Sequence, residues 1–288
     1  MNHPSPHVFP YQAMATGFEI RIALGDREYA RQAARAACDV CTRMEGLLSR
    51  YDPASEISAV NRLADGEAIR LSPETFACLA LAEELQRRTR GAFDPGLGAW
   101  TVPAPEGGPA PAPRGQLLLD PDRLAAGRRG GAVSLDLGAI GKGYALDRMA
   151  ETLREWEIED ALLVAGGSSI IALGAPDPEE TGWEIGIGLE GQPSRLFRLR
   201  DGAIGSSGAA VKGVHILDPA TGAPRMNHTR SWAVSREAAV CDALSTAWMN
   251  LLPPEIEKIC LQLPESGALL GNGGEIREIA LPPFFRRL

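Results

Sequence analysis

The stretch Asp136-Leu137-Gly138-Ala139-Ile140-Gly141-Lys142-Gly143 stands between an expected strand and an expected helix. The helix is predicted over residues 141–156, because Leu146, Met149, Leu153 and Trp156 share one of its faces. Glycines beside a helix N-terminus let backbone N–H groups approach an anion, and Lys142 adds a positive charge. Gly143 stands where a Walker loop requires a hydroxyl, so that motif is excluded. From these residues alone, a tight strand–helix turn and a phosphate-binding turn are both open.

Helices and strands follow this unit on both sides without strict alternation. Helical spacing is predicted over 27–50, from 72 to about 90, and over 237–252, whereas strands are predicted at 18–24, 161–165, 169–173, 183–189 and 231–235. Residues 196–204 are predicted to form a hairpin turning at Asp201-Gly202. This mixture predicts the α+β fold class.

The composition excludes several classes of protein. The chain has 288 residues, of which 44% are hydrophobic and 23% charged, which is typical of a soluble globular protein. There is no apolar run of eighteen residues, so no membrane-spanning helix is expected. A net charge of −8 without a basic cluster argues against nucleic-acid binding. The five cysteines are expected to pack in the core, as in a reducing compartment.

Two Pro-rich regions, one at the N-terminus and one further along the first half of the chain, suggest how the domain is organised. Residues 1–13 are expected to be a flexible N-terminus, and 14–288 a single domain with a Pro/Gly-rich surface insertion at 101–115. The first seventeen residues lack Lys, Arg and an apolar core, and no cysteine precedes Cys38. Without a secretory signal or a lipid-anchor cysteine, a cytoplasmic location is expected.

Two further polar groupings are candidates for chemistry. Asp242 and Thr246 lie four residues apart in an expected helix and so share a face. Both offer hard oxygen donors of the kind that Mg²⁺ prefers, although a polar helix face is the more common interpretation of such a pair. His215 precedes Asp218-Pro219, which is either an acid–base pair or a capped turn.

Taken in order, these segments resemble the FAD:protein FMN transferases, the ApbE-type flavin transferases. The resemblance covers about residues 14–252, and no single motif carries it. The matching segments are Met14-Ala15-Thr16, Leu48-Ser49-Arg50-Tyr51, Ser55-Glu56-Ile57-Ser58 with Asn61, Gly91-Ala92-Phe93-Asp94-Pro95, 136–145, Ala165-Gly166-Gly167, Ser206-Ser207-Gly208, His215-Ile216-Leu217-Asp218-Pro219 and 242–247.

The resemblance implies a fold, an activity and a set of site residues. It implies largely antiparallel sheets flanked by helices in a compact two-lobed domain. It also implies Mg²⁺-dependent transfer of the FMN half of FAD to a Thr or Ser hydroxyl of an acceptor protein, with release of AMP. The implied Mg²⁺ ligands are Asp242, Thr246 and the main-chain carbonyl of Ala139. The implied FAD contacts are Met14, Tyr51, Ala92, Phe93, Asp94, Asp136, Lys142 and Ile216. Of these, Tyr51 or Phe93 is expected to offer an aromatic face, and His215 is the candidate for proton transfer.

The chain also departs from the family pattern. Residues 209–214 are shorter than the usual stretch, the 101–115 loop replaces a longer segment, and Ser168 stands where Asp is common. Two alternative functions therefore stay open: an FAD pyrophosphatase that gives FMN and AMP, and a non-catalytic FAD-binding module. The acceptor protein is not identified by the sequence.

Overall fold

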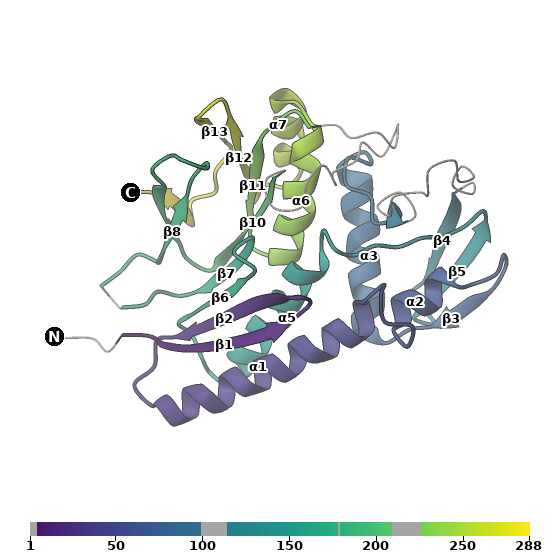
Figure 1. The fold of residues 1–288 in the computed structure, drawn as a ribbon, viewed down its shortest axis with the longest axis horizontal. Helices are drawn as coiled ribbons and strands as arrows, with labels where there is room; N and C mark the ends of the chain where they lie inside the picture. The colour runs from purple at the N-terminus through teal and green to yellow at the C-terminus, as the bar shows by residue number, and fades with distance from the viewer. Residues whose placement is uncertain (1–4, 99–113, 178, 209–225) are drawn as a thin grey trace.

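An eight-stranded antiparallel sheet forms the centre of the molecule (Figure 1). The structure is a computed structural model and describes residues 5–98, 114–177, 179–208 and 226–288. The strand order is β1-β2-β6-β7-β10-β11-β12-β13. The strands are β1 (His7–Ala13), β2 (Thr16–Ile22), β6 (Ala161–Ala165), β7 (Ser169–Leu173), β10 (Gly202–Gly208), β11 (Arg230–Ser235), β12 (Gly267–Asn272) and β13 (Glu275–Ile279).

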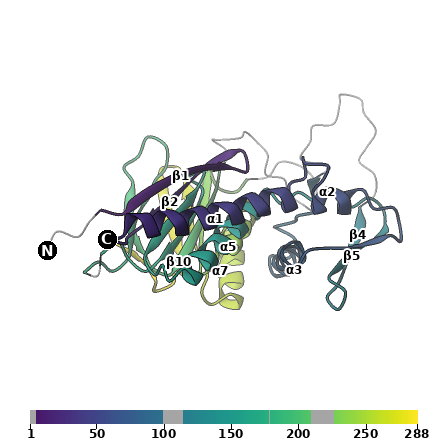
Figure 2. The ribbon, with the colours of Figure 1, turned by 90° about the horizontal axis from the view of Figure 1, so that it is seen from below.

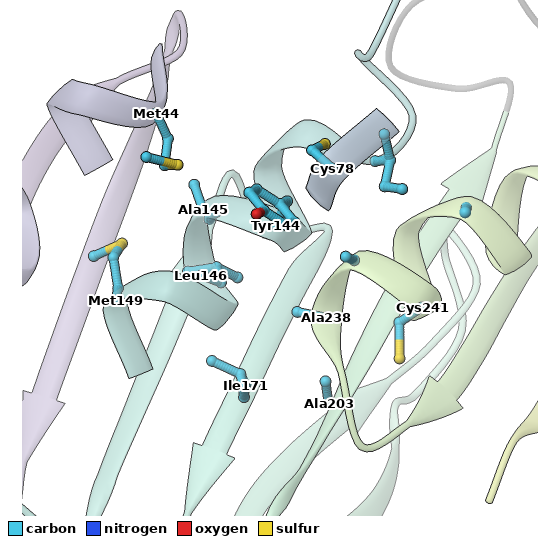
Figure 3. Close-up of a cluster of buried hydrophobic side chains, with 14 of the residues drawn as sticks. Met44, Cys78, Tyr144, Ala145, Leu146, Met149, Ile171, Ala203, Ala238 and Cys241 are labelled. Carbon is cyan, nitrogen blue, oxygen red and sulfur yellow. The ribbon is translucent and has the colours of Figure 1, made fainter. Parts of the chain in front are cut away.

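Helices cover one face of this sheet (Figures 1 and 2). They are α1 (Arg27–Leu48), α5 (Gly141–Glu155), α6 (Ala238–Asn250) and α7 (Pro253–Gln262). Figure 3 shows α5 with Leu146 and Met149 between Met44 of α1 and the start of α6, above Ile171 of β7. Because successive strand side chains point to opposite faces, Leu163 joins this helix-covered core while its neighbour Leu162 joins a second core behind the sheet.

A small sheet packs against the other face, in the order β14-β9-β8. Its strands are β8 (Trp183–Ile187), β9 (Arg195–Leu199) and β14 (Phe285–Arg287). The predicted hairpin at Asp201-Gly202 is therefore wrong, because β9 pairs with β8 and β14 whereas β10 pairs with β7 and β11. Short-range alternation does not reveal that the chain changes sheets at this turn.

A second, smaller lobe lies beyond the C-terminal end of α1 (Figure 2). It contains α2 (Glu56–Asn61), α3 (Pro73–Arg88) and a three-stranded sheet of β3 (Ala68–Arg70), β5 (Ala125–Gly130) and β4 (Gly115–Asp120), in that order. Leu79 of α3 and Ala126 of β5 belong to the same buried cluster as α1 and α5. One hydrophobic core thus runs through both lobes. The α+β class with mixed, largely antiparallel sheets is confirmed.

Two predicted boundaries need correction. Residues His7–Ala13 do not form a flexible segment: they are strand β1, which pairs along its whole length with β2. Most of the predicted 101–115 insertion lies outside the described residues, but Gly115 already begins β4. Pro residues near β1 and β4 favour loops when the sequence is considered locally. Each strand forms because it pairs with a strand further along the chain, β2 for β1 and β5 for β4.

All five cysteines are buried and free, which confirms that they pack in the core. Burial raises the pKa of the Cys78 thiol to about 12. In the part of the chain that the structure describes, no helix has both the length and the apolar character to cross a membrane.

Candidate functional site

The N-terminus of α5 meets the second turn of α6 at the predicted glycine-rich stretch. The backbone N–H of Gly143 donates to Oδ2 of Asp242 at 2.8 Å, and Nζ of Lys142 lies 3.4 Å from the same oxygen. The N-cap residue of α5, Ile140, is apolar and supplies no side-chain hydrogen bond. The backbone N–H of Lys142 donates to no group among the described residues. A cationic side chain and an unpaired helix N–H therefore occur together at one point.

The carboxylate of Asp242 is almost completely buried, with 4% of the residue exposed. Its other oxygen, Oδ1, accepts a hydrogen bond from Oγ of Ser169 at 2.7 Å. Ser169 begins β7 and is fully buried, so the contact joins α6 to the central sheet. A buried carboxylate needs such donors to offset its lost hydration, and here they come from both a helix and a strand.

Hydroxyl groups continue the site along α6. Oγ1 of Thr246 lies 3.2 Å from both the main-chain oxygen of Asp242 and Oγ of Ser207. Ser207 Oγ also lies 3.0 Å from Oγ of Ser245. The structure therefore brings Lys142, Asp242 and Thr246 into one oxygen-rich cluster.

The donor set of this cluster fits magnesium better than a transition metal. Oxygen atoms from a carboxylate and several hydroxyls gather here, and Ala139 is half-buried in the turn before α5. Among the described residues there is no group of three or more His, Cys, Asp or Glu side chains that would form a complete protein cage. Mg²⁺ commonly takes few protein ligands and completes its coordination with water and phosphate oxygens.

A second group of predicted residues lies where α1 ends. Arg50 Nη1 forms an ion pair with Oδ2 of Asp136 at 2.6 Å, and both side chains are largely buried. The backbone N–H of Asp136 donates to the carbonyl of Pro95 at 2.8 Å. Oδ1 of Asp136 accepts from the N–H of Gly138 at 2.9 Å, which fixes the start of the glycine-rich stretch. Arg50 belongs to the segment Leu48-Ser49-Arg50-Tyr51 of the family resemblance, but the sequence alone indicates no role for its side chain.

The aromatic residues of this group differ sharply in exposure. Tyr51 is 83% exposed, and the Arg50 guanidinium lies 5.2 Å from the centre of its ring. Phe93 is 2% exposed and packs in the core, so of the two aromatic side chains it is Tyr51 that presents its ring to solvent. Ala92, beside it, is half-buried. Asp94 pairs with Arg114 at 2.5 Å and accepts from the N–H of Gly96, so it fixes the turn before Gly96.

Met14 lies in the tight turn between β1 and β2. It has a positive φ of 50°, and its backbone N–H donates to Oε1 of Glu45 at 2.8 Å. This turn is at the same end of the sheet as Gly166-Gly167 and Ser207, because Phe18 pairs with Ala165, and Ser169 with Gly205. His215 and Ile216 lie outside the described residues.

Sequence reasoning missed Ser169, Ser207 and Arg50 as site residues. Arg50 and Ser207 lie within segments of the family resemblance, and Ser169 begins a predicted strand. Their partners are 73, 39 and 86 positions away in the chain. Local spacing carries no information about contacts at such separation, so no signal in the sequence alone could have assigned them.

Comparisons with known proteins give the family of this arrangement. Residues 14–270 match the ApbE family. The chain belongs to the ApbE family. This ApbE-family chain is 29% identical over 262 residues to the FAD:protein FMN transferase of Treponema pallidum (strain Nichols), covering 77% of this chain and 71% of the relative. It is 25% identical over 275 residues to the FAD:protein FMN transferase of Chlamydia muridarum, covering 84% of each chain.

Solved structures of the family share the fold. The crystal structure of the ApbE protein of Thermotoga maritima superposes with a TM-score of 0.79 at 25% identity, covering 95% of this chain and 97% of the other. The flavin transferase ApbE of Vibrio cholerae gives the same TM-score at 19% identity, covering 98% and 99% of the two chains. The two-lobed architecture of this ApbE-family chain is thus common to distant relatives.

Proposed function

We propose that this ApbE-family enzyme transfers the FMN half of FAD to a Thr or Ser hydroxyl of an acceptor protein and releases AMP. The observation that carries the proposal is the 3.4 Å approach of the Lys142 ammonium to the Asp242 carboxylate. It joins the start of α5, where helix N–H groups would bind an anion, to the carboxylate–hydroxyl pair of α6, so phosphates and a cation could meet there. The relatives' names support FAD as the substrate and a protein as the acceptor.

The chemistry required is attack on a diphosphate. The acceptor hydroxyl oxygen forms a bond to the phosphorus of the FMN half, and the bond from that phosphorus to the AMP oxygen breaks. The proton of the hydroxyl passes to a base, for which His215 is the proposed group. The diphosphate is anionic and repels the nucleophile, so the site must supply positive charge.

The residues of the chain divide this work. Asp242, Thr246 and the carbonyl of Ala139 would hold Mg²⁺, which supplies charge neutralisation and polarises the phosphorus–oxygen bonds. Lys142 already occupies Oδ2 of Asp242, so in the loaded enzyme its ammonium would turn toward the phosphate oxygens. The unpaired N–H of Lys142 at the α5 start would donate to the same group.

The remaining proposed residues would bind the rest of FAD. Tyr51 presents the exposed aromatic face, and Arg50 with Asp136 forms the polar wall beside it. Met14, Ala92, Phe93, Asp94 and Ile216 are the other proposed contacts. For Phe93 the contact would be made by its backbone, because its ring is buried.

Mass spectrometry tests the proposal directly. The full chain is incubated with FAD, Mg²⁺ and an acceptor domain from a relative's system, with that relative's enzyme in parallel. An FMN adduct on the acceptor together with AMP is expected. AMP and free FMN without an adduct would show a pyrophosphatase instead. FAD binding with no AMP over hours would show a binding module.

A Lys142→Met variant sharpens this test. Removing the ammonium takes away a cation that competes for Asp242, so Mg²⁺ alone should bind more tightly, whereas FAD binding and transfer should weaken. If both affinities fell together, Lys142 would not exchange between the carboxylate and the phosphates.

A further inference from the structure

In the helix-covered core, α5 and α6 each supply a carboxylate that accepts hydrogen bonds from the N-terminal N–H groups of the other helix. Asp242 of α6 accepts from the first-turn N–H of Gly143 in α5. In the opposite direction, Asp147 of α5 accepts from the N–H groups of Ala238 and Ala239 in α6, at 2.7 and 2.9 Å. Neither helix has a side-chain cap of its own, because Ile140 and Glu237 make no capping hydrogen bond.

We infer that Asp147 is a positioning residue: by capping α6 it sets the place of Asp242 one turn further along, and so the geometry of the proposed magnesium site. Asp147 is 6% exposed and forms both bonds with separate carboxyl oxygens. Asp147 and Gly143 are four residues apart, so they lie on the same face of α5. The two reciprocal bonds therefore hold both ends of one short helix–helix contact.

Helix α6 packs closely against both α5 and β10. A Cβ at Gly143 would lie 2.1 Å from the carbonyl oxygen of Ala238, so the two helices approach as closely as glycine allows. On the other side of α6, a Cβ at Gly205 of β10 would lie 2.6 Å from the carbonyl carbon of Cys241 and 2.7 Å from the backbone nitrogen of Asp242. Figure 3 shows Ala238 on the side of α6 that faces α5, and Cys241 pointing from α6 toward the sheet that carries Ala203. Asp147 supplies the polar contact that aligns α6 within this narrow space.

Variants at position 147 test the inference with a readout that does not depend on turnover. Mg²⁺ binding to the full chain is measured by calorimetry for wild type, Asp147→Ala and Asp147→Asn. Asp147→Ala should weaken Mg²⁺ binding at least about fivefold, since outer residues that orient metal ligands commonly change metal affinity by about 10–100-fold. Asp147→Asn keeps one accepting oxygen, so its Mg²⁺ affinity should lie between those of wild type and Asp147→Ala.

Two controls separate positioning from stability. Asp26→Ala makes the same chemical change at the start of α1, where Asp26 accepts from the N–H groups of Glu28 and Tyr29 at 2.9 and 3.0 Å. Leu199→Ala destabilises the second core, where Leu199 is fully buried. Leu199→Ala should lower Tm, and both controls should change Mg²⁺ affinity less than about twofold.

Hydrogen exchange gives a second readout that needs no metal. The Gly143 N–H should exchange at least about tenfold faster in Asp147→Ala, or in Asp147→Asn if the alanine variant does not fold, and at the wild-type rate in Asp26→Ala. Unchanged Gly143 exchange together with unchanged Mg²⁺ affinity would overturn the inference. The inference rests on the proposed function for its metal, and failure of wild type to bind Mg²⁺ would overturn that function while the exchange result still decides the role of Asp147.

Discussion

The Asp242 side of the site and the Tyr51 side are held in different ways. Asp242 is buried and bonded to α5 and β7, and glycines on two neighbouring elements fix the helix that carries it. Tyr51 is mostly exposed, just after the C-terminal end of α1, and its recorded ring contact is the Arg50 guanidinium. The contrast teaches that groups proposed to act on the diphosphate are fixed in advance, whereas the group proposed to hold a flat ring is free to adjust.

The largest expected effect comes from Asp242→Ala. It removes the only carboxylate of the proposed metal site and leaves the Gly143 N–H and Ser169 hydroxyl without their acceptor. FMN transfer should fall on the order of 100-fold with altered Mg²⁺ dependence, and unfolding free energy should fall by about 1–3 kcal/mol. Mg²⁺-titrated transfer assays and denaturant melts measure both. Asp39→Ala, on the exposed face of α1, is the control, and unchanged Mg²⁺ dependence in Asp242→Ala would place the metal elsewhere.

Gly143→Ala should destabilise the helix contact next. The added methyl group meets the Ala238 backbone, and overpacking of this kind costs about 1–3 kcal/mol. Gly46→Ala is the matched control, because Gly46 is exposed in α1 with nothing within 4 Å of its added Cβ. That change should stabilise the chain by about 0.5–1 kcal/mol. Equal denaturation midpoints for the two variants would contradict the close approach of α5 and α6.

The pH dependence of stability tests how Asp147 is buried. Burial raises its pKa from 3.8 to about 7, against the lowering effect of the Ala238 and Ala239 N–H groups; Glu237 raises it further and Arg148 lowers it. The folded state then binds a proton that the unfolded state releases, so this group stabilises the fold fully below pH 3.8.

That contribution should be lost as pH rises from about 4 to 7, by an amount on the order of a few kcal/mol. Asp147→Asn cannot titrate and should flatten this part of the curve. Chemical denaturation of both proteins between pH 4 and 8 checks the slope. Parallel curves would mean that Asp147 is already ionised throughout.

The smallest expected effect is that of Tyr51→Ala. Its ring is exposed, so stability should stay within about 0.5 kcal/mol. FAD affinity should fall by up to about tenfold, because an aromatic stacking contact contributes about 0.5–1.5 kcal/mol. Quenching of FAD fluorescence measures the affinity, and Leu261→Ala, which is equally exposed on α7, serves as control. An effect of Tyr51→Ala on Mg²⁺ affinity would erase the distinction between the two sides.

Much of the fold follows from local pattern, and the exceptions share one cause. The helices predicted over residues 27–50 and 72–90 nearly coincide with α1 and α3. Caps such as Ser72 and regular apolar spacing are local signals, so the sequence shows them directly. Strand β1, the β3–β5 sheet and the sheet change after β9 were not predicted. Each depends on a partner strand that local propensity does not specify.

The amino-acid sequence was sufficient for the family, the α+β class, the buried cysteines and the chemistry of the candidate donors at Lys142, Asp242 and Thr246. These properties reside in residue type and short-range order. The folded structure was needed to show that Asp242 bonds to Ser169 and Gly143, that Arg50 pairs with Asp136, and that Asp147 caps the helix bearing Asp242. Such contacts join residues many tens of positions apart, and only the packing of α5, α6 and the central sheet brings them within hydrogen-bond distance.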